Sequence, residues 1–402
     1  MPAPERGDMV YDAVVVGGGP AGATAATELA AGGRRVLLLD RAGRIKPCGG
    51  AVPPKLLEDF DVPHSILVGR AHAARMIAPS ARSVDMPVGE GFVGMVARDI
   101  FDEWLRERAA EKGAERRTGS FETLARDAEG TAIVRYRRTR GGPLEEVKAR
   151  SVIGADGARS KVARQSVRGA ERMPFVFAYH EVIESPPEDG EGFDRKRCDV
   201  FYQGDLSPDF YAWIFPHGDT ASVGVGSANK GYPLRPAVKR MREASGLSGC
   251  GTIRCEGAPI PLKPLKRWDN GRDVILAGDA AGVVAPASGE GIFYAMTSGR
   301  LAAEAVEAFL ATGRARALRR ARRRFMALHG RVFWILGIMQ YFWYSSDRRR
   351  ERFVKICADP DVQELTWQAY LNKKLVRARP GAHLRIFLND MAHLLGLAPI
   401  AR

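Results

Sequence analysis

The strongest constraint on the fold is a glycine motif near the N-terminus, set between a short apolar run and a stretch of small residues. The run DAVVV spans residues 12–16, the motif is Gly17-x-Gly19-x-x-Gly22, and small residues recur with helical spacing over residues 23–31. The first glycine permits a tight turn, the second lets backbone approach a pyrophosphate, and the third lets helix and strand pack closely. The sequence therefore predicts a strand–turn–helix unit whose helix N-terminus faces a dinucleotide phosphate.

Asp40 completes this element. It ends a second apolar run over residues 36–39, at the position where an acidic side chain accepts a hydrogen bond from a ribose hydroxyl. The glycines, the helix and the acid together predict a βαβ dinucleotide site rather than an ordinary glycine-rich turn, and up to this point FAD and NAD suit it equally. We also assign Pro20, Ala21 and Arg41 to the cofactor site.

Two further segments decide between these cofactors. Residues 152–164 read VIGADGARSKVAR and residues 273–291 read DVILAGDAAGVVAPASGEG. With the N-terminal motif they resemble, in the same order, the signatures of the flavoprotein hydroxylase superfamily. The resemblance implies FAD, with Asp279 at its ribityl chain and a helix N-terminus that stabilises the negative charge of a reduced flavin. It also implies cofactor contacts from Asp156, Gly278, Gly289, Gly291 and Arg98. For Arg98 the alternative interpretation is a solvent-facing residue at the start of a helix.

Periodic patterns organise the rest of the chain. Residues 98–112 predict an amphipathic helix, and alternating residues between about 166 and 262 predict an antiparallel sheet. The expected fold class is α/β: a glutathione-reductase-like FAD-binding Rossmann domain, an antiparallel β-sheet substrate domain and a C-terminal helical region. We assign the FAD-binding domain to residues 8–165 and 263–312, with a substrate-domain insertion near 62–96, the substrate domain to 166–262 and the helical region to 313–402.

A loop and a strand narrow the family. The loop KPCGGAVPPKLL (residues 46–57) and the segment FYAWIFPHGDTASVGVG (residues 210–226) together resemble geranylgeranyl reductases, and the tail from Tyr344 resembles their chlorophyll and bacteriochlorophyll branch. The resemblance covers nearly the whole chain. It implies an FAD-dependent enzyme that hydrogenates three double bonds of a geranylgeranyl chain, carried by (bacterio)chlorophyll or by a diphosphate, to give phytyl. No second GxGxxG occurs, so a nicotinamide donor must bind transiently or the electrons must come from elsewhere. With the resemblance, we expect NADPH as the transient donor. The alternatives are a flavin monooxygenase of the same fold and a non-enzymatic membrane or pigment-binding flavoprotein.

The segment FYAWIFP carries the predicted substrate site. Tyr211, Trp213 and Phe215 alternate, so a strand places them on one face. That face is either packed core or one wall of a tunnel for an isoprenoid chain, and with Pro216 we assign it to substrate binding. An isolated alkene must be protonated as hydride arrives, and an aromatic face stabilises the cationic carbon by about 1–2 kcal/mol.

The same chemistry needs a proton donor near the flavin. Cys48 is the first candidate, because a thiol is protonated at neutral pH and Gly49 lets the loop approach closely; its alternatives are a buried structural cysteine and a substrate-positioning group. Tyr211 and His217 are lesser donors. Cys48, Tyr211 and Trp213 form the catalytic assignment, and Cys48 and Gly49 are also assigned to the cofactor site. We assign no metal.

Charge and cysteine content predict the setting. The net charge is +14, and residues 314–324 hold seven arginines beside the aromatic stretch 332–344, which is too short to span a bilayer. The alternatives are a solvated helix face, nucleic-acid binding, for which no recognition motif is present, and binding of a diphosphate group by the basic patch. We favour peripheral attachment to an anionic membrane and no nucleic-acid partner. Five cysteines without a CxxC pair or signal sequence predict a reducing, cytoplasmic setting. The resemblance to the chlorophyll and bacteriochlorophyll branch further implies a location on the inner face of a photosynthetic membrane.

Overall fold

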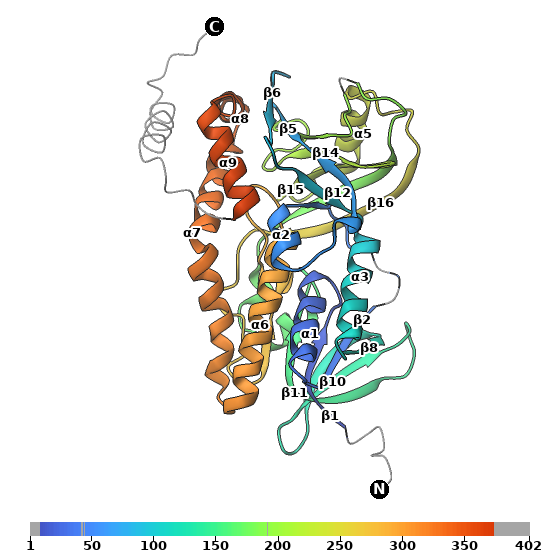
Figure 1. The fold of residues 1–402 in the computed structure, drawn as a ribbon, viewed down its shortest axis with the longest axis vertical. Coiled ribbons are helices and arrows are strands. Elements are labelled where there is room, and N and C mark those ends of the chain that lie inside the picture. The colour runs from blue at the N-terminus through green and yellow to red at the C-terminus, as the bar shows by residue number, and fades with distance from the viewer. Residues whose placement is uncertain (1–8, 42, 44, 191, 374–402) are drawn as a thin grey trace. The chain divides into compact units, whose positions relative to one another are not determined.

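The computed structural model describes residues 9–373 apart from residues 42, 44 and 191, and it divides into two compact units (Figure 1). Both units are assembled from separate stretches of the chain. The first unit comprises Met1–Cys48, Ala97–Phe177 and Ala258–Ile338, and the second comprises Gly49–Val96, Ala178–Gly257 and Met339–Arg402.

The first unit contains the predicted Rossmann-like sheet. Strand β1 is flanked by β2 and β11 as parallel neighbours, and β17 pairs with β11 in the same direction, whereas β9 and β10 extend the sheet antiparallel. The α/β class expected from the sequence is confirmed. In sheet order the strands are β8 (Glu115–Thr118), β2 (Val36–Asp40), β1 (Val10–Val16), β11 (Glu145–Gly154), β10 (Ala132–Arg137) and β9 (Ser120–Arg126), with β17 (Val274–Leu276) beside β11.

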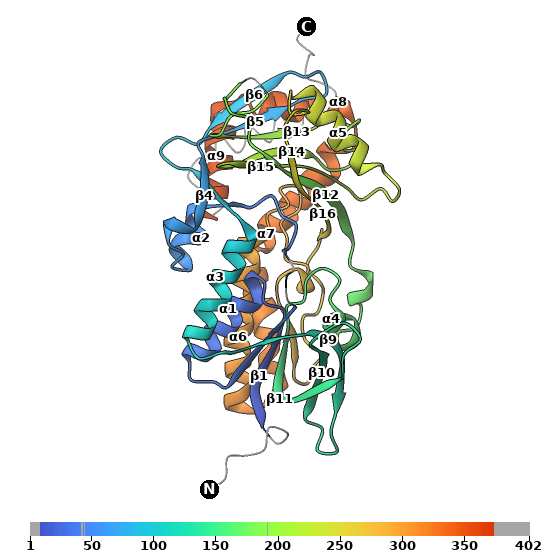
Figure 2. The ribbon, with the colours of Figure 1, turned by 90° about the vertical axis from the view of Figure 1, so that its right-hand side faces the viewer.

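Helices of small residues pack against this sheet. Gly299 lies where α6 crosses α1, and a Cβ there would overlap with the backbone of Ala21, so the two helix backbones come into direct contact. Figure 2 shows α1, α3 and α6 gathered beside β1. The helices of this unit are α1 (Pro20–Ala31), α3 (Arg98–Glu111), α4 (Lys161–Ser166), α6 (Ile292–Thr312) and α7 (Arg319–Trp343), which passes into the second unit after Ile338.

The second unit is built on a mixed sheet. In it β14 pairs antiparallel with β13 and β15, β5 pairs antiparallel with β6, and β13 runs parallel to β5. In sheet order they are β16 (Thr252–Pro261), β12 (Phe175–Glu184), β15 (Thr220–Ser227), β14 (Ala212–His217), β13 (Arg197–Phe201), β5 (Ala73–Ile77) and β6 (Ser83–Pro87). A smaller sheet has the order β3 (Ala51–Val52), β7 (Val93–Val96) and β4 (Leu67–Ala71).

Among the described residues, four α-helices lie wholly within the second unit. Helix α5 covers one face of the larger sheet, where Met241 joins a buried cluster with Ile214, Val223 and Val225. That cluster uses the alternate residues of β14, so its aromatic residues lie on the opposite face. The helices are α2 (Pro54–Asp59), α5 (Leu234–Ala244), α8 (Asp347–Ile356) and α9 (Pro360–Asn372).

The division into units differs from the predicted domains at several boundaries. The stretch predicted as 166–262 runs from Ala178 to Gly257 in the second unit, and the inserted segment and the tail differ as well. The inserted segment begins at Gly49 rather than near residue 62, because β3 already pairs with β7 of the second unit. The tail after residue 313 is not a region of its own, since it divides at Ile338. Among the described residues no helix has both the length and the hydropathy that crossing a bilayer requires.

Aromatic packing explains why the tail divides. Before Ile338, the Phe325 ring lies 5.2 Å from the Trp268 ring of the first unit. After it, the Tyr344 ring lies 5.3 Å from the Tyr202 ring of the second unit. The continuous helical pattern of the sequence does not reveal this change of partner.

Candidate functional site

The glycine motif forms the turn between β1 and α1. Gly17 has a φ of +106°, and a Cβ there would overlap with the carbonyl oxygen of Ala155. A Cβ at Gly22 would overlap with the carbonyl oxygen of Gly17, so both positions require glycine. At Gly19 an added Cβ would meet no atom within 4 Å. Gly19 therefore leaves open space at the start of α1, as a pyrophosphate site requires.

Helices α1, α3 and α6 of this unit begin without a side-chain cap, and α1 and α6 each follow a glycine. Helix α1 starts at Pro20 after Gly19, and α6 starts at Ile292 after Gly291. The first backbone N–H groups of a helix carry partial positive charge and need acceptors. Both N-termini can therefore receive anionic groups of a cofactor.

Close packing holds the two helices at their starts. Gly278 has a φ of +62°, and a Cβ there would lie 2.7 Å from the Cβ of Ala21. Gly289, just before α6, has a φ of +66°. These predicted cofactor residues therefore shape the backbone next to the helix N-termini.

Asp40 lies at the end of β2, as predicted. Its carboxylate accepts backbone N–H groups of Gly18 and Arg41, and burial raises its pKa. Arg106 of α3 lies beside it, with Nη1 3.3 Å from Oδ2 of Asp40. Sequence reasoning missed Arg106, because nothing local indicates a partner 66 residues away. The side chain of Arg41 is exposed.

Asp279 is buried in the short 3-10 helix Gly278–Ala281, and its side chain lies near the start of α6. Its side chain forms an ion pair with Lys46, and its Oδ1 lies 4.0 Å from the position of a Cβ on Gly291. The structure thus brings Asp279 and Gly291 together, as the predicted flavin site requires. Lys46 was not predicted, although it opens the KPCGG loop.

Arg98 is a buried cation rather than a solvent-facing residue. The whole residue is 4% exposed, which excludes the alternative interpretation of its place at the start of α3. It holds Asp102 through two hydrogen bonds, from Nε at 2.8 Å and from Nη2 at 2.7 Å. Arg98 is also hydrogen-bonded to the side chain of Cys48. The candidate proton donor therefore has a fixed positive charge as its neighbour within the first unit.

Asp156 accepts hydrogen bonds from residues at the start of α4. Its carboxylate accepts from the hydroxyl of Ser160 and from the backbone N–H of Lys161 at 2.6 Å and of Val162 at 3.2 Å. Burial raises its pKa. These contacts cap the start of α4, which fixes the GADG turn.

Together these residues fit FAD. Open space at Gly19 and an uncapped α1 suit a pyrophosphate, Asp40 suits a ribose, and a second uncapped helix beside Asp279 suits the flavin end. Arg98 supplies a buried donor group in the same unit. At Gly17, Gly22 and Gly278 a side chain would strain the backbone or overlap with a neighbour, so these glycines shape the backbone around the proposed site.

The predicted aromatic residues lie on one face of the larger sheet of the second unit. The Tyr211 ring lies 6.0 Å from the Trp213 ring, which lies 6.3 Å from the Phe215 ring. Tyr211 stacks on Phe210 just before β14 begins. Tyr211, Trp213 and Pro216 are buried, and Phe215 is half-buried.

Glycines make room for these rings. A Cβ at Gly49 would lie 3.0 Å from the Phe215 ring, and a Cβ at Gly224 of β15 would overlap with the Trp213 ring. The part of the PCGG loop that belongs to this unit therefore packs on the aromatic face. His217, the lesser donor candidate, bonds the Phe215 carbonyl oxygen through Nδ1, and burial lowers its pKa to about 4. It is neutral at pH 7 and a poor source of protons.

Known sequences match this chain over nearly its full length. The profile of a family described as pyridine nucleotide-disulphide oxidoreductase matches residues 11–186. A geranylgeranyl diphosphate reductase of Rhodobacter capsulatus is 54% identical over 97% of this chain and 99% of that protein. A geranylgeranyl diphosphate reductase of Synechocystis is 36% identical over 97% of this chain and 100% of that protein. The chloroplastic protein of this name from Oryza sativa is 35% identical over 96% of this chain and 87% of that protein.

Solved structures share the fold. A geranylgeranyl bacteriochlorophyll reductase-like protein of Thermoplasma acidophilum superposes with a TM-score of 0.79 at 22% identity, over 93% of this chain and 99% of that one. A flavin-dependent brominase superposes with a TM-score of 0.73 at 16% identity, over 96% of this chain and 100% of that one. At these identities the structures establish the fold, whereas the sequence relatives establish the family.

Proposed function

Because this chain belongs to the geranylgeranyl diphosphate reductase family, we propose that it uses FAD to hydrogenate the isolated double bonds of a geranylgeranyl chain. It is an oxidoreductase with an FAD-binding domain. The observation that carries the proposal is that a relative of this name is 54% identical over 97% of the chain. Two structural features support it: the turn formed by Gly17, Gly19 and Gly22 in the first unit, and the aromatic sheet face of the second unit.

FAD, when bound and reduced, supplies the hydride. Residues of the first unit would hold it: the start of α1 at the pyrophosphate, Asp40 at the ribose, and Asp279 with the start of α6 at the flavin end. Lys46 already neutralises the buried carboxylate of Asp279. An isolated alkene accepts no hydride without a proton, so the rest of the chemistry falls to protein side chains.

Cys48 is the proposed proton donor. Its thiol is hydrogen-bonded to Arg98, whose positive charge compensates the thiolate that proton transfer leaves behind. Arg98 is itself held by Asp102. The ion pair of Arg98 and Asp102 therefore holds the positive charge in place while the Cys48 thiol donates its proton and is protonated again.

The aromatic face supplies the proposed substrate site. Tyr211, Trp213 and Phe215 form one continuous set of rings along β14. Such rings accommodate an isoprenoid chain by apolar contact and stabilise developing positive charge on a tertiary carbon by about 1–2 kcal/mol. This is a larger gain than aliphatic side chains in the same place would provide.

We propose NADPH as the electron donor and a geranylgeranyl chain on (bacterio)chlorophyll or on a diphosphate as substrate. The absence of a second glycine motif in the sequence supports transient binding of the donor. The names of the plant relatives, which are chloroplastic, support the pigment branch.

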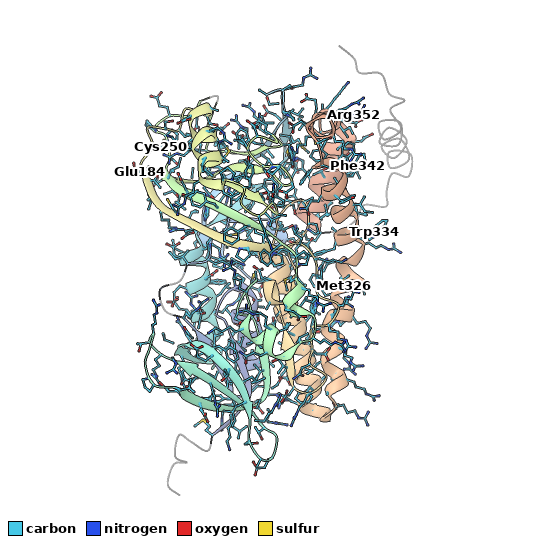
Figure 3. All side chains as sticks on the ribbon, turned by 180° about the vertical axis from the view of Figure 1, so that it is seen from behind. Glu184, Cys250, Met326, Trp334, Phe342 and Arg352 are labelled. Carbon is cyan, nitrogen blue, oxygen red and sulfur yellow. The ribbon has the colours of Figure 1, made fainter. Side chains whose placement is uncertain are left out.

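We further propose peripheral attachment to an anionic membrane from the cytoplasmic side. One face of α7 is formed by residues spaced three or four apart, at positions 320, 323, 327, 331, 334 and 338. This face carries arginines near the start of the helix and Trp334 and Ile338 further along it. Trp334 is 69% exposed and Ile338 is 47% exposed. Figure 3 labels Trp334 and Met326 along this helix. A basic face that continues into apolar residues suits an anionic lipid surface.

The test is an aerobic incubation of the flavin-loaded protein with NADPH and geranylgeranyl diphosphate, followed by mass analysis of the prenyl chain. The proposal predicts products that carry two, four and six additional hydrogens and no added oxygen. A hydroxylated chain would instead establish a monooxygenase. NADPH consumption with an unchanged chain would contradict the proposed function.

A further inference from the structure

A chain of hydrogen bonds crosses the larger sheet of the second unit and ends at Trp213. The indole Nε1–H donates to Oγ of Ser222 at 3.1 Å, and Oγ of Ser222 lies 3.0 Å from Nδ1 of His180. Nε2 of His180 lies 3.0 Å from Oε2 of Glu256. The four residues come from β14, β15, β12 and β16, which are consecutive neighbours in the sheet.

This chain of hydrogen bonds is buried, and one assignment of donors and acceptors satisfies all of its members. Trp213, Ser222 and His180 are each 5% exposed or less. A neutral His180 protonated at Nε2 satisfies every group: Trp213 donates to Ser222, Ser222 donates to Nδ1 of His180, and Nε2–H donates to Glu256. Arg254 lies at the far end, with Nε 3.0 Å from Oε1 of Glu256. The charge of the carboxylate is therefore compensated.

Steric contacts confine the same indole. A Cβ at Gly224 would overlap with the Trp213 ring and would lie 2.6 Å from the Cβ of His180. On the other side, a Cβ at Gly49 would lie 3.6 Å from Nε1 of Trp213. The two glycines define a slot, and the bond to Ser222 selects one orientation of the ring within it.

We propose that Ser222 and His180 are positioning residues for the reduction, which hold and polarise the Trp213 indole beside the prenyl chain. The inference rests on the proposed function, since Trp213 belongs to its aromatic substrate face. Hydrogen bonds in series strengthen one another, so an indole N–H that donates into this chain gains electron density in its ring. A more electron-rich ring attracts a developing tertiary cation more strongly.

The first experiment observes Trp213 directly. The protein has six tryptophans, so an NMR spectrum of the ¹⁵N-labelled holoenzyme shows the indole N–H groups, and Trp213→Phe identifies the signal of interest by its loss. We expect Ser222→Ala to move this signal upfield and to speed its exchange with solvent at least tenfold. Ser227→Ala is the matched control, because Ser227 is a buried serine of the same strand that bonds Asp209 instead. An unchanged Trp213 signal in Ser222→Ala would overturn the proposal.

The second experiment measures turnover of geranylgeranyl diphosphate. Ser222→Ala should lower kcat about tenfold while KM stays within about twofold, and Ser222→Thr, which keeps a hydroxyl, should restore most of the rate. Ser227→Ala should match the wild type. A shifted Trp213 signal with wild-type kcat would overturn the catalytic part of the proposal. Wild-type protein that is inactive on this substrate would contradict the proposed function, whereas the NMR result would still decide whether Ser222 holds Trp213.

Discussion

At the scale of single residues, the first unit places a thiol beside a buried cation. Cys48 is hydrogen-bonded to Arg98, and Arg98 is held by Asp102 in a pair whose side chains are only 4% and 7% exposed. A guanidinium is not deprotonated at physiological pH, and the carboxylate of Asp102 compensates its charge in the buried position. The arrangement therefore supplies a permanent positive neighbour for a thiol that gives up its proton.

Replacing this thiol tests its role. We expect Cys48→Ala to keep the flavin and the folded state and to lose at least about 100-fold in kcat, because general acid catalysis contributes factors of about 10² to 10⁴. The measurements are the flavin absorbance of the purified variant and its rate of prenyl reduction. Cys255→Ala, at an exposed cysteine, is the matched control and should turn over normally. A fully active Cys48→Ala variant would remove Cys48 from the mechanism.

A second prediction concerns His217, whose pKa burial lowers from 6.5 to about 4. The unfolded chain binds a proton at this group below pH 6.5 and the folded chain does not, so stability is complete above pH 6.5 and is lost as pH falls toward 4. Urea denaturation measures the free energy of unfolding at pH 7 and at pH 5. The decrease in this free energy from pH 7 to pH 5 should be about 2 kcal/mol smaller in His217→Gln than in the wild type. His64→Gln, at an exposed histidine, should retain the wild-type slope. An identical slope in His217→Gln would refute this assignment.

At the scale of elements, helix starts carry the cofactor chemistry. Helices α1 and α6 begin at glycines without side-chain caps, and Gly278 and Gly299 bring their backbones together at Ala21. Packing and binding thus use different glycines. Side chains at Gly22 and Gly299 would overlap with neighbouring backbone, whereas Gly19 faces open space, where we propose that the pyrophosphate binds.

That separation predicts an informative variant. Gly19→Val should fold, because its side chain meets no protein atom near Cβ, but should be purified with less than about a tenth of the wild-type flavin. Visible absorbance reports the flavin and thermal unfolding reports the fold. Gly249→Val is the control, since that exposed glycine also has open space around its Cβ. Full flavin content in Gly19→Val would exclude the pyrophosphate assignment.

The exposed face of α7 supports a prediction on lipid binding. Sedimentation with phosphatidylglycerol vesicles should capture the protein at low salt, and Trp334→Ser together with Ile338→Ser should reduce the bound fraction at least threefold, since both side chains are exposed on the basic helix. Raising the salt should release it. Ile253→Ser, at an exposed isoleucine of β16, should bind as the wild type does. Binding that is equal with neutral phosphatidylcholine, or unaffected by the double substitution, would contradict the membrane proposal.

At the scale of the whole molecule, local patterns were predictable and distant partners were not. The glycine turn, Asp40 and the alternating rings of β14 follow from spacing along a single segment. The pair of Lys46 and Asp279 joins residues 233 positions apart, and His180 meets Glu256 across 76 positions. Such partners are chosen by tertiary packing, which spacing does not encode. The change of unit within α7 is of the same kind, because both halves of the helix have one continuous pattern.

A single turnover tests the proposed reaction most directly. The flavin-loaded protein is reduced without oxygen or pyridine nucleotide, mixed with one equivalent of geranylgeranyl diphosphate, and analysed by flavin absorbance and product mass. The account predicts that the flavin becomes oxidised while the prenyl chain gains two hydrogens in equal amount. Reduced flavin that persists beside an unchanged prenyl chain would contradict it.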